Sequence, residues 1–369
     1  MILRNCTIDE FAYRTMDKKI VCFGAYVMPR SLCSEYEEYH FEDRIAYFVD
    51  NDKNKQGQDF LLADGKRGRI LSVEQFIKCV DEKTVLIITS DYFAAIIEQL
   101  DQYRELDGLH CYIYPFMKYD MNYTERITVR HNTELLIPKV IHYFWFGGNP
   151  RTELMETCIE SWRRHCPDYE IIEWNEDNYD IAKHTYMKEA YDAGKYSFVS
   201  DYARLDVICH YGGIYFDTDV EVLKSIDDML YNEAFYGLGC YGRIATGLGF
   251  GSVSGQKVVR RLLEAYDTFS FRRSNGDINL DTNTIREEHV FKELGLKQKN
   301  EFQTVAGASV FPSDFMSPQI PGFNSYKISC NTVTVHHNRF SWATQTQMEE
   351  FQKSVEEYGR IRYRFEHDY

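Results

Sequence analysis

Three acidic side chains stand at alternate positions, Asp217, Asp219 and Glu221, directly after a short apolar run. The run itself, residues 212–216 (GGIYF), predicts a buried strand. If the strand continues, the three carboxylates share one face at intervals of about 7 Å. Like charges this close repel one another and are costly to desolvate. A divalent cation would remove that cost, and it could also hold the diphosphate of a nucleotide sugar.

Three other interpretations apply to this acidic segment. A solvated strand end needs no ligand. A calcium loop is excluded because Val220 and Val222 occupy positions where oxygen ligands are required. A phosphatase of the haloacid dehalogenase type also begins with a hydrophobic strand and Asp-x-Asp, but it has Thr or Val where this chain has Glu221. The phosphatase stays as an alternative from another reaction class.

A helix is expected before the acidic segment, over about residues 199–210, and the two glycines at 212–213 end it. Asp201 and Arg204 are three positions apart and therefore share one helical face. They could form a local ion pair and nothing more. With the acidic segment one tight turn away, they could instead face a sugar and its phosphates.

The stretch SDYARLDVICHYGGIYFDTDVEV, residues 200–222, resembles the signature of the family 32 glycosyltransferases. These are the capsular-polysaccharide and yeast-type mannosyltransferase relatives, and the stretch is also similar to the glucosylating clostridial toxins. Further blocks in the same order extend the resemblance over about residues 137–342: IPKVIHYFWFGG, SWRRHCPDYEIIEWNED and HHNRFSW.

The resemblance implies a GT-A-like α/β domain that transfers a sugar from a UDP- or GDP-sugar donor with retention of configuration. It implies Mn²⁺ or Mg²⁺ as cofactor and a glycan or lipid-linked glycan as acceptor, in bacterial surface polysaccharide synthesis. A protein that binds a nucleotide sugar without turning it over is the other alternative to the transferase.

The resemblance also implies roles for residues that match the family's motifs. Trp145 matches the aromatic that stacks on the nucleobase, and Asp201 and Arg204 match the pair that contacts the donor sugar. Tyr215 would lie beside the donor. Asp217 would contact ribose, sugar or metal.

Asp219 would ligate the metal directly in the same comparison. In the late block His336 is preferred to His337 as a further ligand on the metal or phosphate side. Ser341 and Trp342 would cover the diphosphate. The residues between His337 and Ser341 depart from the commoner HHxxGSW-like form, so the third metal ligand stays open; they are Asn338, Arg339 and Phe340.

A separate sheet is expected in the first part of the chain. Apolar runs suited to strands alternate with a helical pattern and predict a parallel, doubly wound sheet over 19–25, 44–52, 83–90 and 110–116. The segment VDNDKNKQGQ resembles small Rossmann-like domains fused to bacterial sugar-processing enzymes. A dinucleotide site needs GxGxxG after the first strand, whereas this turn has only Gly24. A scaffold or docking domain is therefore favoured over a nicotinamide-dependent oxidoreductase.

The domain prediction places a Rossmann-like domain at 1–116, a polar linker at 117–136 and the GT-A-like domain at 137–369. The last of these includes a C-terminal helix with apolar helical spacing. Three arginines near its end complement the helix C-terminus, with contact to a phospholipid surface as the alternative: Arg360, Arg362 and Arg364.

Composition narrows the classes further. A chain of 369 residues predicts two domains, and its net charge of −15 argues against nucleic acid as a partner. No apolar run approaches the roughly 20 residues of a membrane span. The ten cysteines are scattered and predict reduced thiols. A cytoplasmic protein is expected, with the inner face of the membrane as the place of any peripheral contact.

Overall fold

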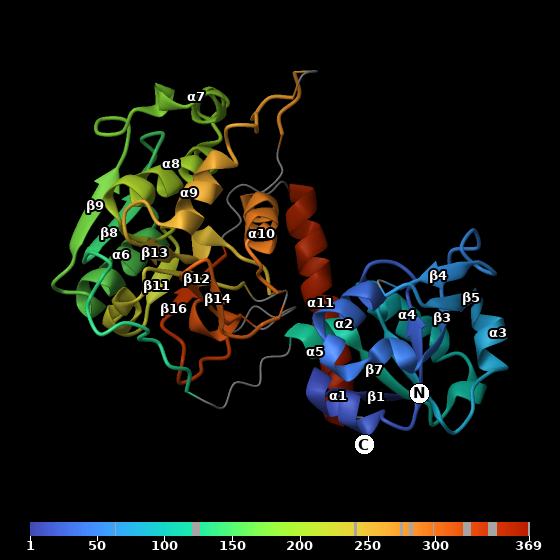
Figure 1. The fold of residues 1–369 in the computed structure, drawn as a ribbon. Coiled ribbons are helices and arrows are strands. Elements are labelled where there is room, and N and C mark those ends of the chain that lie inside the picture. Colours follow the sequence, from blue (N-terminus) through green and yellow to red (C-terminus); the bar gives the residue numbers. More distant parts are fainter. Residues whose placement is uncertain are drawn as a thin grey trace. The chain divides into compact units, whose positions relative to one another are not determined.

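The computed structural model describes residues 1–62, 64–119, 126–239, 242–273, 276–279, 283–297, 299–319, 326–338 and 345–367. The described residues form two compact units, each with its own sheet (Figure 1). Residues 1–119 and 351–367 belong to the first unit, and the described residues between 126 and 350 belong to the second. None of the described helices is long and apolar enough to cross a membrane.

The sheet of the first unit has seven strands in the order β1-β7-β6-β2-β3-β5-β4. Every neighbouring pair is parallel except β4 with β5. The strands are β1 Ile2–Arg4, β2 Lys19–Phe23, β3 Ile45–Val49, β4 Asp59–Leu61, β5 Arg67–Leu71, β6 Thr84–Ile88 and β7 His110–Ile113. The Rossmann-like parallel sheet expected from the sequence is thus confirmed, with β5 and the short β1 and β4 added.

Helices cover both faces of this sheet because its central strands are apolar on both faces. They are α1 Ile8–Arg14, α2 Met28–Glu35, α3 Val73–Ile77, α4 Phe93–Leu100 and α5 Tyr114–Tyr119. One core contains Phe11 of α1 and Leu32 of α2, and the other contains Phe76 of α3 and Ile97 of α4. The order of strands and helices is that of a doubly wound α/β unit.

The C-terminal helix α11, Gln345–His367, completes the second of these cores from residue 351 onward. The ring of Tyr358 lies 4.8 Å from the rings of both Phe93 and Phe116. Arg360 pairs with Glu98, and Nη1 of Arg364 lies 2.7 Å from Asp101. From the sequence this helix is expected in the second domain. The apolar spacing predicts a buried helical face, but it does not say which core that face meets.

The second unit is built on a mixed sheet in the order β14-β15-β12-β13-β10-β8-β9. Its strands are β8 Val140–Phe144, β9 Glu170–Trp174, β10 Gly213–Tyr215, β12 Ala234–Gly237, β13 Phe250–Ser252, β14 Gln303–Val305 and β15 Ala308–Phe311. A separate antiparallel pair joins β11, Val220–Val222, to β16, Thr334–His336. This mixed α/β arrangement agrees with the fold class expected from the sequence.

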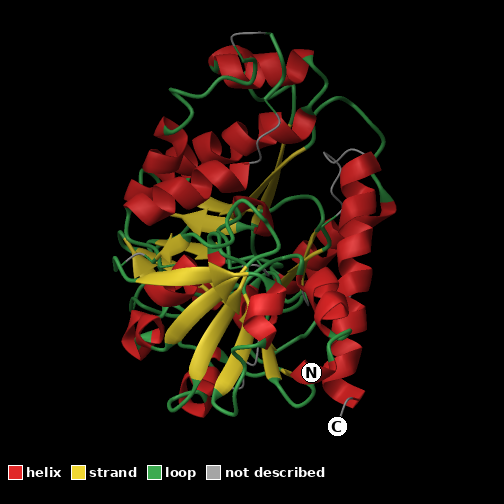
Figure 2. Ribbon diagram, turned by 90° about the vertical axis from the view of Figure 1, so that its right-hand side faces the viewer, coloured by secondary structure: helices red, strands yellow, loops and turns green. Residues whose placement is uncertain are grey.

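Two hydrophobic cores lie on opposite faces of the mixed sheet. Figure 2 shows the helices in red beside the strands in yellow. Strand β10 shows the division, because Ile214 enters one core and Tyr215 the other. Helix α6, Glu153–His165, packs on the side of Ile214. The side of Tyr215 is covered by α7 Thr185–Asp192, α8 Tyr196–Tyr211, α9 Lys257–Glu264 and α10 Asn283–Glu293.

A sharp turn joins α8 to β10 and positions the candidate site. The helix ends at Gly212, whose φ is 69°, and Gly213 follows with φ of 100°. A Cβ atom on Gly213 would lie 2.8 Å from the carbonyl oxygen of Val140, so only glycine lets β10 approach β8 here. Helix α8 confirms the helix expected over residues 199–210. The turn and the short strand β10 then lead directly to the acidic segment.

Candidate active site

Asp217 and Asp219 lie in the turn between β10 and β11, and not in one continuous strand. Phe216 makes the last backbone bond to the large sheet, to His142, and the chain then leaves to pair with β16. The amide of Val220 closes the turn on the carbonyl of Asp217 at 3.1 Å. The expectation that three carboxylates share one strand face is therefore wrong, because the chain changes sheets between them.

Three potential metal ligands converge at this turn, namely Asp217, Asp219 and His336, with one ligand atom from each within 4.8 Å of the others. Nε2 of His336 lies 3.2 Å from Oδ1 of Asp219 and 3.8 Å from Oδ2 of Asp217. The register of the small sheet causes the approach, since Val220 pairs with His336. Glu221 is not in the cluster.

The same register separates the two neighbouring histidines. Nε2 of His337 lies 3.0 Å from the carboxylate of Glu221, and its Nδ1 lies 3.3 Å from the hydroxyl of Tyr326. His336 instead places Nδ1 at 2.6 Å from Oδ1 of Asn338, which leaves Nε2 toward the two aspartates. An Nδ1–H that donates to Asn338 fixes the tautomer that a ligating Nε2 requires.

The donor set suits a divalent cation. Two carboxylate oxygens and one imidazole nitrogen are ligands that Mn²⁺ accepts, and Mg²⁺ takes such carboxylates readily. Burial lowers the pKa of His336, but the charges of Asp219 and Asp217 outweigh it and raise the pKa to about 10. A bound cation would replace that proton, and His336 would then ligate as neutral imidazole.

Asp217 uses its two oxygens for different partners. The hydroxyl of Tyr215 donates to Oδ1, and Nη1 of Arg204 lies 3.4 Å from the same oxygen. Oδ2 is the oxygen toward His336. The carboxylate is therefore held in an orientation that presents one oxygen to the metal-type cluster.

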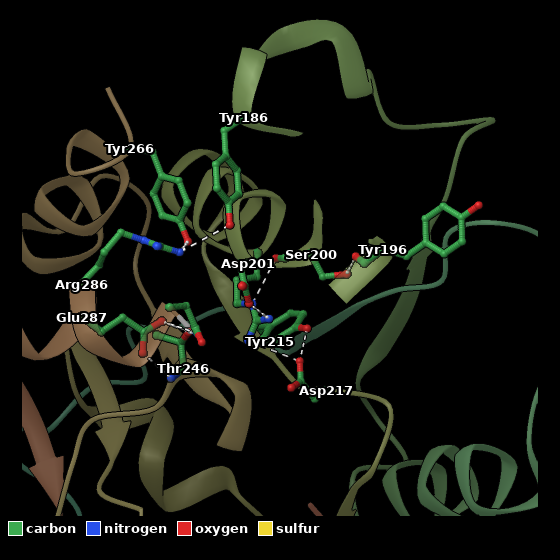
Figure 3. Close-up of polar contacts among 12 residues, drawn as sticks. Tyr186, Tyr196, Ser200, Asp201, Tyr215, Asp217, Thr246, Tyr266, Arg286 and Glu287 are labelled. Carbon is green, nitrogen blue, oxygen red and sulfur yellow. Dashed lines mark hydrogen bonds and ion pairs between the residues drawn. The ribbon is translucent and has the colours of Figure 1, made fainter. Parts of the chain in front are cut away.

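Arg204 connects the acidic turn to Asp201 on α8. Its Nη2 lies 2.5 Å from Oδ1 of Asp201, its Nε donates to the carbonyl of Ser200 at 3.0 Å, and its guanidinium lies 4.8 Å from the ring centre of Tyr215. Burial raises the pKa of Asp201 to about 6, although Arg204 acts in the opposite direction. Asp201, Tyr215 and Asp217 are seen together in Figure 3. A buried cation beside several acids is suited to stabilising negative charge on a bound diphosphate.

Trp145 lies just after β8 and is half-buried against the core that contains α6. Its Nε1–H donates to the carbonyl of Asn149 at 2.8 Å. Trp145 therefore both packs on the core and is partly exposed to solvent. Ser341 and Trp342 lie outside the described residues.

A second group of buried and half-buried polar residues, which the sequence did not predict, lies on α10 and on the turn η6, Thr246–Leu248 (Figure 3). The carboxylate of Glu287 accepts the backbone N–H of Thr246 at 2.9 Å. The guanidinium of Arg286 lies 4.0 Å from the ring centre of Phe269 and 4.8 Å from that of Tyr266. Glu287 is only 2% exposed, and burial of a carboxylate is the feature that draws attention to it. No local sequence pattern predicts this burial.

Comparison with known proteins agrees with this geometry. Residues 152–236 match a protein family described as "Glycosyltransferase sugar-binding region containing DXD motif". The matched stretch includes Asp201, Arg204, Asp217 and Asp219. The chain carries a DXD glycosyltransferase region. This agrees with the resemblance read from the sequence and favours a glycosyltransferase over the phosphatase alternative.

Curated relatives match over part of their length. Inositol phosphoceramide mannosyltransferase 1 of Schizosaccharomyces pombe is 30% identical over 110 residues, which are 27% of this chain and 33% of the relative. Mannosyl phosphorylinositol ceramide synthase SUR1 of Saccharomyces cerevisiae is 32% identical over 111 residues, 27% of each chain. The chain thus spans about a third or less of the relatives it matches. A solved structure, PaToxG Glycosyltransferase, aligns with a TM-score of 0.34 and 17% identity over 43% of this chain and 70% of its own.

Proposed function

We propose that the protein is a metal-dependent, retaining glycosyltransferase that moves a sugar from a nucleotide diphosphate donor to a glycan or lipid-linked glycan. The observation that carries the proposal is the convergence of Asp217, Asp219 and His336 beside the buried Arg204. A dense acidic cluster next to a fixed cation suits a ligand that combines phosphates with a metal ion.

The proposal gives one role to the three residues of the cluster and another to Arg204. Asp217, Asp219 and His336 hold Mn²⁺ or Mg²⁺, which when bound offsets the charge that builds on the departing nucleoside diphosphate. Arg204 adds a guanidinium whose orientation is fixed by Asp201 and the carbonyl of Ser200. Because the group is held before the reaction, it needs little reorganisation as charge develops.

The proposal extends to the donor and the face of attack. Trp145 would stack on the nucleobase, and Tyr215 would line the donor while orienting Asp217. Ser341 and Trp342 would cover the diphosphate, as the sequence resemblance implies. The same resemblance supports retention of configuration. We therefore propose a same-face displacement in which the leaving phosphate takes the acceptor proton.

The names of the relatives suggest the first substrates to test. The Schizosaccharomyces pombe relative is named a mannosyltransferase, and the Saccharomyces cerevisiae relative is named a mannosyl phosphorylinositol ceramide synthase, so a mannosyl nucleotide is the leading donor candidate. Both names also mention a ceramide lipid, which makes a lipid-linked acceptor a candidate for this chain. For this chain we propose a glycan or lipid-linked acceptor of bacterial surface polysaccharide synthesis, met at the cytoplasmic face of the membrane.

The test is a hydrolysis screen of UDP- and GDP-sugars with Mn²⁺, Mg²⁺ or excess chelator, because slow donor hydrolysis needs no acceptor. The proposal expects release of one nucleoside diphosphate that depends on added metal. Phosphate release from a sugar phosphate would identify a phosphatase instead. Tight donor binding without hydrolysis or transfer would identify a binding protein.

A further inference from the structure

The turn η6 lies directly against the Asp217 carboxylate. A Cβ atom built on Gly247 would lie 2.6 Å from Oδ2 of Asp217 and 3.3 Å from Nη1 of Arg204. Oδ2 is the oxygen that faces His336. The space of a side chain at position 247 is thus occupied by the oxygen that Asp217 presents to the metal-type cluster.

The backbone itself does not demand glycine at this position. Gly247 is not among the residues with positive φ, whereas Gly249 two positions later has φ of 106°. An ordinary L-residue could adopt the conformation of Gly247 without strain. Glycine is required there because of what lies beside it, and its nearest neighbours belong to the site.

Glu287 anchors this turn from α10 (Figure 3). Its Oε2 accepts the Thr246 N–H, while its Oε1 accepts the Thr246 hydroxyl and, at 2.8 Å, the amide of Asn283. The side chain is only 2% exposed. A buried carboxylate with three donors holds its partners firmly, since an unsatisfied acceptor in that environment would be costly.

We propose that Gly247 and Glu287 are positioning residues for the metal-ligating carboxylate of Asp217. Glu287 fixes the turn, and Gly247 leaves the space in which Oδ2 of Asp217 faces His336. On the other side of the carboxylate, Tyr215 and Arg204 hold Oδ1. The inference rests on the proposed function, because it takes Asp217 as a ligand of the divalent cation.

The test is Gly247→Ala in the full-length protein. The electron paramagnetic resonance signal of free Mn²⁺ measures how much Mn²⁺ the protein binds. The clash falls on the end of a flexible side chain, so Asp217 can rotate away and the fold survives. We expect Mn²⁺ affinity to fall at least tenfold. Gly239→Ala is the matched control: Gly239 also lacks positive φ, and the nearest atom to its Cβ is 3.5 Å away. The control should bind Mn²⁺ as the wild type does.

A second background separates positioning from folding. In Asp217→Ala protein, adding Gly247→Ala should cause no further loss of Mn²⁺ affinity, because the displaced carboxylate is gone. If Gly247→Ala alone does not fold, the double variant must regain the thermal stability of Asp217→Ala. Failure to regain it overturns the inference, since the strain would then fall elsewhere than on Asp217.

Glu287→Gln tests the anchor. The carboxylate offers two acceptor oxygens to three donors, whereas the amide of glutamine offers one acceptor oxygen. We expect Mn²⁺ affinity to fall at least threefold, less than for Gly247→Ala. Wild-type Mn²⁺ affinity in Glu287→Gln overturns the anchoring role, and wild-type affinity in Gly247→Ala overturns the positioning role. A wild-type protein that binds no Mn²⁺ refutes the proposed metal site itself.

Discussion

Both units place an aspartate after a strand of a main sheet, and only one of the two aspartates faces other acidic ligands. In the first unit Asp50 follows β3, and its Oδ2 accepts the N–H of Ala25 at 2.9 Å and lies 3.1 Å from Nζ of Lys55. Oδ1 accepts the N–H of Asp52 at 2.9 Å. In the second unit Asp217 turns Oδ2 toward His336 instead, in a cluster that also contains Asp219. An acid at a strand end is thus a weak sign of function until its partners are known.

The glycines teach the same lesson. A Cβ atom on Gly24, after β2, would lie 2.6 Å from the carbonyl oxygen of Thr89, so this glycine permits close packing of two strand ends. A Cβ atom on Gly247 would instead meet the side chains of Asp217 and Arg204. Backbone packing accounts for the first glycine, whereas the side chains of Asp217 and Arg204 account for the second.

The largest expected effect is that of Asp219→Ala. Removing a metal ligand should lower metal-dependent donor hydrolysis about 100- to 1,000-fold, since a bound cation contributes several kcal/mol of charge stabilisation. Donor hydrolysis and Mn²⁺ titration measure the loss, and circular dichroism checks the fold. Full hydrolysis by this variant in excess chelator would show that Asp219 holds no catalytic metal, so its position would be no more functional than that of Asp50.

Arg204→Lys should have the next largest effect. Lysine keeps the charge but loses the planar group that contacts Asp201 and the carbonyl of Ser200 together. We expect turnover to fall about 10- to 100-fold, less than the loss of a complete preorganised donor. Steady-state kinetics with the donor identified in the screen gives the answer. Turnover close to wild type would reduce the Asp201–Arg204 pair to a structural ion pair.

Trp145→Ala separates base stacking from core packing. If the ring stacks on the base, nucleotide binding should weaken by about 1–3 kcal/mol, with little change in melting temperature. Calorimetric titration with the nucleoside diphosphate and thermal unfolding measure the two quantities. A large drop in melting temperature with unchanged affinity would support packing alone.

Asp50→Ala should leave donor chemistry untouched and act on stability. It removes the acceptor for the N–H groups of Ala25 and Asp52, which should cost about 1–3 kcal/mol in the free energy of unfolding of the first unit. Denaturant unfolding measures this loss, with donor hydrolysis as the control. Loss of hydrolysis in a protein that is still folded would mean that the first unit contributes to the active site.

Much of this architecture was predictable because its signals are local. The apolar runs of β2, β3, β6 and β7 and the glycines after α8 identified the elements without long-range information. The sequence predicted the acidic residues of the turn but not the path of the backbone through it. The chain leaves the large sheet after β10 because β11 pairs with β16, which is more than 100 residues away.

Long-range contacts decided what the sequence left open. In the structure the pairing of Val220 with His336 places His336 beside Asp217 and Asp219, while His337 contacts Glu221. Gly247 and Glu287 carry no local pattern that links them to Asp217. The apolar face of α11 predicted a helix, and long-range contacts such as those of Tyr358 with Phe93 and Phe116 show that it completes the first unit.

The most direct test of the central claim is the thermodynamic coupling between metal and nucleotide. Calorimetric titration of the wild type with UDP or GDP, in Mn²⁺ and in excess chelator, measures it, and the coupling must be reciprocal for the two ligands. We predict that Mn²⁺ tightens binding of one nucleoside diphosphate at least tenfold and that Asp219→Ala abolishes this gain. Equal affinity with Mn²⁺ and with chelator, in a protein that binds the nucleotide, would contradict a metal site formed by Asp217, Asp219 and His336.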